Sequence, residues 1–225
     1  MVDDGIVIGS DSRSTFVDDS GKQFGYIDGM SKVFVKHDSA IAVSGLSSVS
    51  GELFNSFIAR NDFLLTRSVD EILYSVMLGL PIKNSSNVLL LSAGFSYGQP
   101  VICGKNPTDP QLCRKEGFIT NRESASLSRW YVGMHGVLPK AADAASALQR
   151  AILESSDLDT TIGGPTSILH LRKSGEPEWM ENPPADRGWK TVCDIVSDYR
   201  RGTARILFVR SKDELDRHLD STCAR

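Results

Sequence analysis

Three charged residues stand at the ends of predicted strands, where side chains from separate elements can meet around a reacting group. Asp11 ends the first β-branched segment, Arg13 follows two residues later, and Lys32 opens the next apolar segment. A lysine ammonium lowers the pKa of a neighbouring hydroxyl, provided that a carboxylate keeps the ammonium charged. Such an arrangement is typical of an activated nucleophile.

Each of these residues also has a purely structural interpretation. Asp11 could be a turn former at the end of a strand. Lys32 could be an exposed lysine that protects a sheet edge from pairing. Arg13 could form a surface salt bridge, which contributes little to stability. The residues alone leave both kinds of interpretation open.

The elements that must position these residues begin with short strands, each a β-branched or apolar run bounded by turn residues. The predicted strands are Gly5–Asp11, Lys32–Lys36, Ala40–Ser44, Asn87–Gly94, Pro100–Gly104, Trp130–Gly133, Ser167–Leu171 and Ala204–Val209. We expect the second and third to form one hairpin, and the fourth and fifth another. The turn at Val2–Gly5 is typical of a hairpin, so we also expect a strand upstream of Met1.

Apolar residues at intervals of three and four predict five helices. They are Ser47–Asn61, Ser68–Leu80, Lys140–Leu153, Trp189–Tyr199 and Lys212–Leu219. The first two are expected side by side on one outer face. Paired strands separated by helices predict an α+β fold of antiparallel sheets covered by helices, not a parallel doubly wound sheet. The 225 residues contain no linker, so we expect a single domain over residues 1–225.

Composition excludes several classes of protein. A net charge of -3 gives no electrostatic reason to expect a nucleic acid partner. No apolar run is long enough for a membrane span, and the acidic start is unlike a signal peptide, so we expect a cytoplasmic protein. The four cysteines lack metal-ligand spacing, so we expect reduced thiols and no bound metal.

The segment from Asp4 to Thr15 resembles the start of proteasome β subunits and their bacterial homologues. In that family a strand ends in Gly/Ala-x-Asp-x-Arg, a lysine opens the next hairpin, and Ser/Ala-Gly precedes the first helix. The corresponding segments here are Gly9-Ser10-Asp11-Ser12-Arg13, Lys32-Val33-Phe34 and Ser44-Gly45. Farther along, Asp157–Gly164 is similar to the family's Asp-x-x-Ser-Gly segment, with Ile162 where the family has serine.

The resemblance implies a four-layer α-β-β-α sandwich and a peptidase whose N-terminal threonine is the nucleophile, activated by its own amine. It implies that Lys32 lowers the pKa of the hydroxyl and that Asp11 keeps Lys32 charged. Arg13 would position a loop, and the Gly45 amide would stabilise the oxyanion. Asp159 would support the site from a distance. No cofactor is implied.

Two of these assignments have structural alternatives. Gly45 is also the residue that lets the chain turn from strand to helix, a role compatible with donating to an oxyanion. Asp159 is equally explained as a turn residue at a helix end. Both interpretations stay open at this stage.

The chain departs from the family pattern at its first residue, which is Met1 rather than threonine, serine or cysteine. About six residues, one short strand, stand upstream of this position in the family. We therefore expect the chain as written to be inactive. Three functions remain: a threonine peptidase, a noncatalytic ring-building subunit, and a related amidohydrolase. The resemblance implies self-assembly into rings, protein or peptide substrates and an ATPase unfoldase as partners.

Overall fold

The computed structural model describes most of the chain. The described residues are 1–17, 20, 22–45, 48–49, 52–53, 68–79, 88–106, 110–120, 124–181, 192–208 and 212–223. Within these ranges, no helix is both long enough and apolar enough to cross a membrane.

A three-stranded sheet contains the first strand of the chain. β11 (Ser167–Arg172) lies in its centre and pairs antiparallel with β1 (Gly5–Ser10) and β12 (Glu178–Glu181). Residue Ile6 lies opposite Leu171, and Ser10 lies opposite Ser167. Among the described strands, β1 is an edge strand, so one side of its backbone has no strand partner.

A five-stranded antiparallel sheet forms a second layer, with the strand order β10-β9-β8-β5-β4. Both predicted hairpins are confirmed in it. β4 (Val33–Lys36) pairs with β5 (Ser39–Ser44), and β8 (Leu89–Ser96) pairs with β9 (Gln99–Lys105). The short strand β10 (Leu112–Arg114) extends the sheet beyond β9.

The two sheets face each other across a buried apolar core, to which each sheet contributes. Ile6, Leu169 and Leu171 come from the three-stranded sheet and pack with residues of the larger sheet, including Val33, Ala40, Ala42 and Ile102. Antiparallel strands with one face on a core and alternating side chains account for this arrangement.

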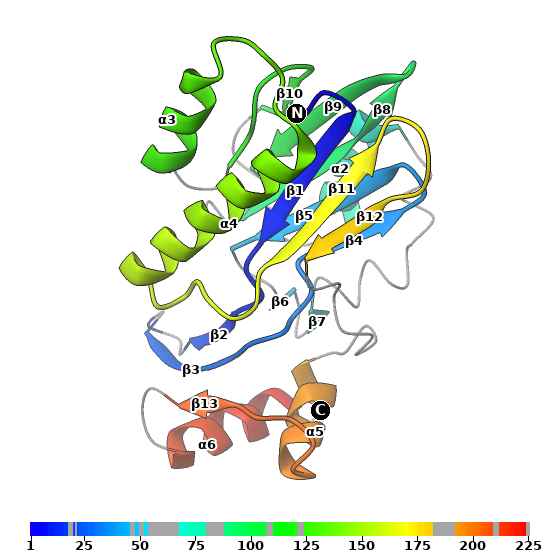
Figure 1. Ribbon diagram of the computed structural model, residues 1–225. Helices are drawn as coiled ribbons and strands as arrows, with labels where there is room; N and C mark the ends of the chain where they lie inside the picture. Colours follow the sequence, from blue (N-terminus) through cyan, green and yellow to red (C-terminus); the bar gives the residue numbers. More distant parts are fainter. Residues whose placement is uncertain are drawn as a thin grey trace.

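Helices cover the outer faces of both sheets (Figure 1). α4 (Ala141–Leu158) packs against β1, with α3 (Ala125–Gly133) beside it. α2 (Val69–Gly79) packs on β8 and β9, and its Ile72, Leu73 and Val76 are fully buried. The predicted mixed α+β fold with antiparallel sheets is therefore confirmed.

The C-terminal elements pack with two strands that the sequence analysis missed. β2 (Ser14–Val17), β3 (Gln23–Ile27) and β13 (Leu207–Phe208) form a small antiparallel sheet. α5 (Val192–Arg200) and α6 (Lys212–Cys223) pack on it around buried Phe24 and Leu215. Polar and glycine residues between Ser12 and Gly29 concealed β2 and β3.

The predicted helix Ser47–Asn61 is wrong where the structure describes it. β6 (Ser48–Val49) and β7 (Glu52–Leu53) form an antiparallel pair instead, and residues 54–61 lie outside the described ranges. The three-to-four spacing of Val49 and Leu53 favoured a helix, but Gly51 stands between them in the sequence, and glycine disfavours a helix interior. The predicted placement of this helix beside Ser68–Leu80 also falls largely on residues outside the described ranges.

The predicted strand Trp130–Gly133 is also wrong, because these residues end helix α3. The hydroxyl of Ser124 accepts a hydrogen bond from the Leu127 amide and caps the helix. The aromatic and β-branched residues favoured a strand locally, but the cap and the packing of α3 on α4 override that preference. The other predicted helices agree with α2, α4, α5 and α6 within a few residues.

The prediction of reduced thiols is wrong, because all four cysteines form disulfides. Cys113 lies opposite Cys103 in the β9–β10 ladder and is bonded to it, and Cys193 of α5 is bonded to Cys223 of α6. Both pairs are brought together by tertiary structure, which no short spacing motif in the sequence could indicate.

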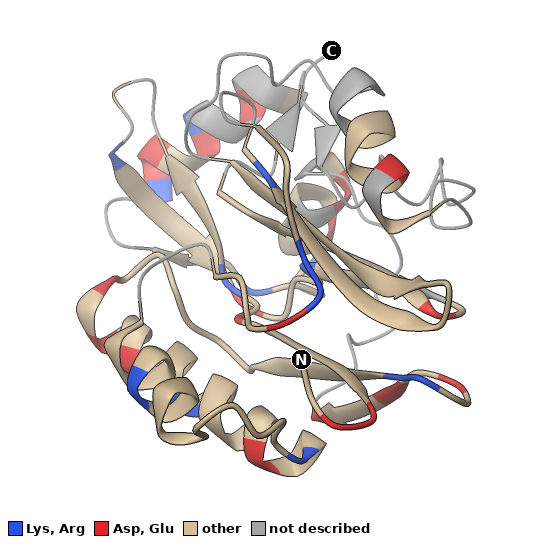
Figure 2. Ribbon diagram, turned by 90° about the horizontal axis from the view of Figure 1, so that it is seen from above, with Lys and Arg blue, Asp and Glu red and all other residues tan. Residues whose placement is uncertain are grey.

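The surface of the described part mixes charges of both signs, as the long helix α4 illustrates (Figure 2). Asp143, Arg150, Glu154 and Asp157 follow one another along it.

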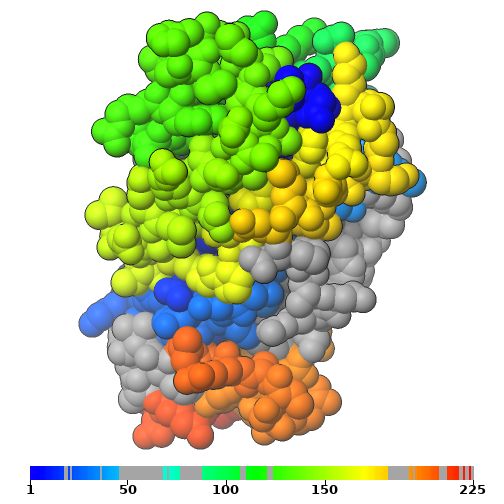
Figure 3. Space-filling model, in the orientation of Figure 1, coloured from blue at the N-terminus to red at the C-terminus, as the bar shows by residue number. Residues whose placement is uncertain are grey.

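The first residues of the chain reach the surface as a dark blue patch between α4 and the β11–β12 hairpin (Figure 3). Met1 itself is buried, and its amine donates a 3.0 Å hydrogen bond to the Gly117 carbonyl.

Candidate functional site

Asp11 and Lys32 form an ion pair at the end of the two facing sheets. Asp11 follows β1 and Lys32 precedes β4, and the Lys32 Nζ to Asp11 Oδ1 distance is 2.7 Å. The side chains are 14% and 20% exposed, respectively. The pair is partly shielded from water, so the attraction is stronger than for a surface pair.

Lys32 keeps donor capacity beyond this ion pair. Among the residues that the structure describes, Asp11 is the hydrogen-bond partner of its ammonium. An ammonium has three N–H donors. The remaining N–H bonds can therefore donate to a hydroxyl or to a ligand placed next to Lys32.

The second carboxylate oxygen of Asp11 is held by backbone donors. The amides of Arg13 and Gly163 each donate to Asp11 Oδ2 at 3.1 Å. The Ser12 amide in turn donates to the Gly163 carbonyl at 3.1 Å. Two backbone amides and an ammonium thus converge on one carboxylate, which fixes the position of Asp11 and of Lys32 beside it.

Arg13 joins a third element to this cluster. Its guanidinium makes two parallel hydrogen bonds to Asp28, at 2.8 and 3.0 Å, and lies 3.8 Å from the centre of the Tyr26 ring. It also donates to the Thr160 carbonyl at 3.1 Å. The hydrogen bonds to Asp28 raise the pKa of Arg13 further above its ordinary value, so the guanidinium stays charged.

The loop after α4 approaches the cluster closely through two glycines. A Cβ atom on Gly163 would lie 2.6 Å from Cζ of Arg13, and one on Gly164 would lie 2.6 Å from Oγ of Ser12. Gly164 also has a φ of +71°, which favours glycine. The site therefore requires glycine here for close approach.

Asp159 lies at the start of this loop, where it follows α4. Its Oδ1 accepts hydrogen bonds from the Thr161 amide at 2.8 Å and from the Thr161 hydroxyl at 2.7 Å. These bonds shape the turn that presents Thr160 and Gly163 to Arg13 and Asp11. Asp159 thus acts on the cluster through the loop.

Gly45 follows β5 at the same end of the sheet as Lys32. The Val43 amide donates to the Lys32 carbonyl at 3.0 Å, and Gly45 comes two residues later with a φ of +94°. Gly45 is exposed, and its backbone conformation is one that glycine adopts without strain. It shares a sheet end with the ion pair.

The structure adds residues to the cluster that the sequence analysis did not select. The Ser12 hydroxyl accepts a hydrogen bond from the Gly29 amide at 3.1 Å, and the Ser12 carbonyl accepts one from Met30 at 2.9 Å. These two hydrogen bonds, together with the contacts of Asp28 and Tyr26 to Arg13, hold the segment that leads from β3 to Lys32. The Asp28-Gly29 turn just before Lys32 is the one sequence signal that could have indicated this.

Among the described residues, no group of three or more histidine, cysteine, aspartate or glutamate side chains could hold a metal ion. The cluster is thus built from ion pairs and backbone hydrogen bonds. No family model and no curated protein matches this chain.

Proposed function

We propose that this chain is a subunit of a proteasome-like threonine peptidase, in which Asp11 and Lys32 activate a threonine hydroxyl supplied by a strand upstream of β1. The observation that carries the proposal is the 2.7 Å ion pair between Lys32 and Asp11, whose ammonium has N–H bonds left for a further partner.

The chemistry of the pair fits nucleophile activation. A threonine hydroxyl is a weak nucleophile until its proton is removed. An adjacent ammonium stabilises the alkoxide form and lowers the pKa of the hydroxyl, while the free α-amine of the same threonine takes the proton through a water. Asp11 is needed because an ammonium out of water without a carboxylate tends to lose its proton.

The layers of the fold support the proposal. Two antiparallel sheets face each other, with α4 outside one sheet and α2 outside the other. We propose that this is the four-layer α-β-β-α sandwich of N-terminal-nucleophile hydrolases. Asp11 follows a strand of one sheet, Lys32 precedes a strand of the other, and the two meet at one end of the sandwich.

The start of the chain supports an added strand beside β1. Val2 and Gly5 pair across a tight turn, and one side of β1 has no strand partner among the described residues. An upstream strand can pair there in antiparallel fashion. The Met1 nitrogen can keep its hydrogen bond to Gly117 as an amide, without a buried charge.

The remaining assignments belong to the same proposal. The Gly45 amide would donate to the oxyanion, since it follows β5 at the end of the sheet that carries Lys32. Arg13 and Asp159 would position the loop after α4 rather than touch the substrate. Rings of subunits, protein or peptide substrates and an ATPase unfoldase are partners that the family resemblance implies.

A cytoplasmic location is also part of the proposal, and the two disulfides are the observation against it. Disulfides persist in oxidising compartments and are rare in the cytosol. Counting the oxidised cysteines in protein alkylated at the moment of cell lysis tests the location separately from the activity.

Peptide hydrolysis by an extended chain tests the proposal. The codons upstream of Met1 are first read for an in-frame threonine, and the chain is then expressed with about six added residues that begin with a free threonine. We expect hydrolysis of fluorogenic peptides by the extended chain and none by the chain that begins at Met1. A ring that assembles without hydrolysis would instead favour the noncatalytic ring-building subunit.

A further inference from the structure

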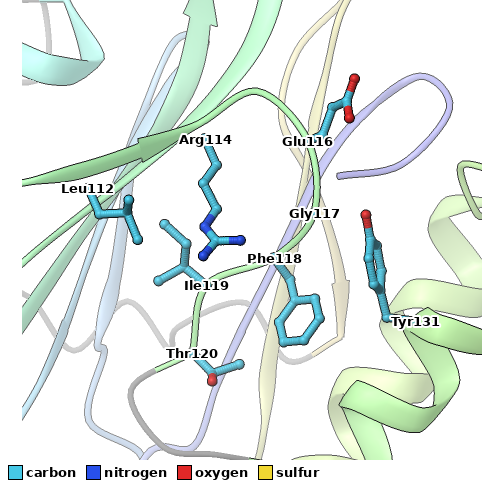
Figure 4. A pocket seen from close by; sticks show the side chains of 8 residues that line it. All are labelled: Leu112, Arg114, Glu116, Gly117, Phe118, Ile119, Thr120 and Tyr131. Atoms are coloured by element: carbon cyan, nitrogen blue, oxygen red, sulfur yellow. The ribbon is translucent and has the colours of Figure 1, made fainter. Parts of the chain in front are cut away.

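A hollow of about 530 Å³ lies at the outer edge of the five-stranded sheet (Figure 4). Its walls are Leu112 and Arg114 of β10, the segment 116–120, and Tyr131 of α3. None of these residues belongs to the cluster around Asp11 and Lys32. The hollow is therefore a separate feature of the molecule.

Arg114 and Tyr131 converge beside Gly117. A Cβ atom on Gly117 would lie 3.6 Å from the Tyr131 hydroxyl oxygen and 3.9 Å from a terminal guanidinium nitrogen of Arg114. Gly117 has a φ of +87°, which favours glycine, and its lack of a side chain leaves this space open. Two hydrogen-bond donors thus lie within 4 Å of the position that a Cβ atom on Gly117 would occupy.

Both donors lack a partner in the part of the chain that the structure describes. Neither the Arg114 guanidinium nor the Tyr131 hydroxyl has a hydrogen bond or ion pair there. Glu116 is the acidic residue of the lining, and its carboxylate points away from Arg114 in Figure 4. The positive charge on this wall is therefore available to an anion.

Apolar side chains form the rest of the lining. Phe118 packs edge-on against the Tyr131 ring at 5.1 Å, and Ile119 lies beside Gly104 of β9. Leu112 is 49% exposed at the opening. An aliphatic or aromatic group of a ligand that packs against these side chains is removed from water, and this favours binding.

The two donors are carried on rigid supports. Cys113, the neighbour of Arg114, is bonded to Cys103 of β9, so β10 is fixed covalently to the sheet. Tyr131 belongs to α3 and is held by its ring contact with Phe118. Donors on rigid supports lose little conformational freedom when a ligand binds.

We propose that this hollow binds small organic carboxylates that carry an apolar group. The carboxylate accepts hydrogen bonds from Arg114 and Tyr131, because a guanidinium matches the planar arrangement of two carboxylate oxygens. The apolar group lies on Leu112, Phe118 and Ile119. The site follows the usual design of small-molecule pockets, with an apolar lining and a few convergent polar groups.

Titration with 3-phenylpropionate, followed by NMR at the Gly117 amide of the intact chain, tests this proposal. We expect a Kd of about 1 mM, typical of a ligand of this size, and binding at least about tenfold weaker for the neutral 3-phenylpropionamide. Arg114→Gln should weaken carboxylate binding about tenfold, and Tyr131→Phe about threefold.

Lys115→Gln is the matched control, because it removes the same charge from the adjacent exposed residue, which does not line the hollow. It should leave the Kd unchanged within about twofold, since exposed charges at a distance are screened. Equal binding of the acid and the amide would overturn the proposal. An unchanged Kd in Arg114→Gln, or an equal loss in Lys115→Gln, would overturn it as well.

Discussion

Asp11 and Gly163 are 152 positions apart in the chain, and the Gly163 amide donates a 3.1 Å hydrogen bond to Asp11 Oδ2. The same carboxylate accepts hydrogen bonds from the Arg13 amide and from the Lys32 ammonium. One side chain therefore joins the end of β1, the start of β4 and the loop after α4. The stability of this junction depends on Asp11 more than on any one of its donors.

Removing Asp11 should destabilise the protein more than removing Lys32. Asp11→Ala leaves two backbone amides and an ammonium without their acceptor, and we expect a loss of about 2–3 kcal/mol in the free energy of unfolding. Lys32→Ala leaves Asp11 its two backbone donors and should cost about 1 kcal/mol. Urea unfolding measures both. The exposed Asp157 provides the control Asp157→Ala, expected within about 0.5 kcal/mol of wild type. A larger cost for Lys32→Ala than for Asp11→Ala would contradict this account of the junction.

The cost of close packing at Gly164 can be measured separately from the cost of its backbone conformation. Gly164 and Gly98 have nearly equal φ values, +71° and +73°, but a Cβ atom on Gly98 would meet nothing within 4 Å. Gly98→Ala should therefore cost about 1 kcal/mol, the penalty of the left-handed conformation. Gly164→Ala also forces a Cβ against Ser12 and Asp28 and should cost at least about 2 kcal/mol more. Equal losses in thermal or urea unfolding would show that the loop does not pack on the cluster as described.

The two disulfides predict a simple thiol count. Protein purified without reductant and unfolded in guanidinium should show no free thiol, and reduction should release four. Reduction should also lower the stability, by about 3–4 kcal/mol through Cys193–Cys223, which joins residues 30 positions apart, and by about 1 kcal/mol less through Cys103–Cys113, which joins residues 10 positions apart. Free thiols in the unreduced protein would mean that the cysteines are not paired as described.

The buried Met1 amine predicts a dependence of stability on pH. Burial lowers the pKa of this amine below its ordinary value of 8.0, so the folded state favours the neutral form. Between the lowered value and 8.0 the unfolded chain binds more protons, and the free energy of unfolding therefore rises with pH across that window. Chemical unfolding at a series of pH values measures the slope. A chain acetylated at Met1 should lack this contribution, and an identical slope in the acetylated chain would contradict the assignment.

The strand hairpins were predictable from sequence because each combines a local period of two with turn residues. Lys32–Lys36 with Ala40–Ser44 illustrates this, since both strands and the turn lie within a short stretch. Helix Ala141–Leu158 was also predictable from local sequence, because it is rich in alanine and has an apolar side. The single domain over residues 1–225 stays a prediction.

The elements that were missed depend on distant contacts. Strand β3 has a glycine in its centre, and β2 and β13 pair with it from opposite sides. In the candidate site, the sequence indicated Asp11, Arg13 and Lys32 because these charged residues stand beside predicted strands. Asp28 and Gly163 were not, because only the folded chain brings them to Arg13 and Asp11.

The measurement that tests the central claim most directly is peptide hydrolysis by the chain extended with an N-terminal threonine, with and without Lys32. We expect kcat/KM for a fluorogenic peptide to fall at least about 100-fold in Lys32→Ala, because the hydroxyl loses the adjacent ammonium. Lys140→Ala removes an exposed lysine that pairs with Asp3 and serves as the control, with a change of less than about threefold. An extended Lys32→Ala chain as active as its parent would contradict the assignment of Lys32 and Asp11 as the activating pair.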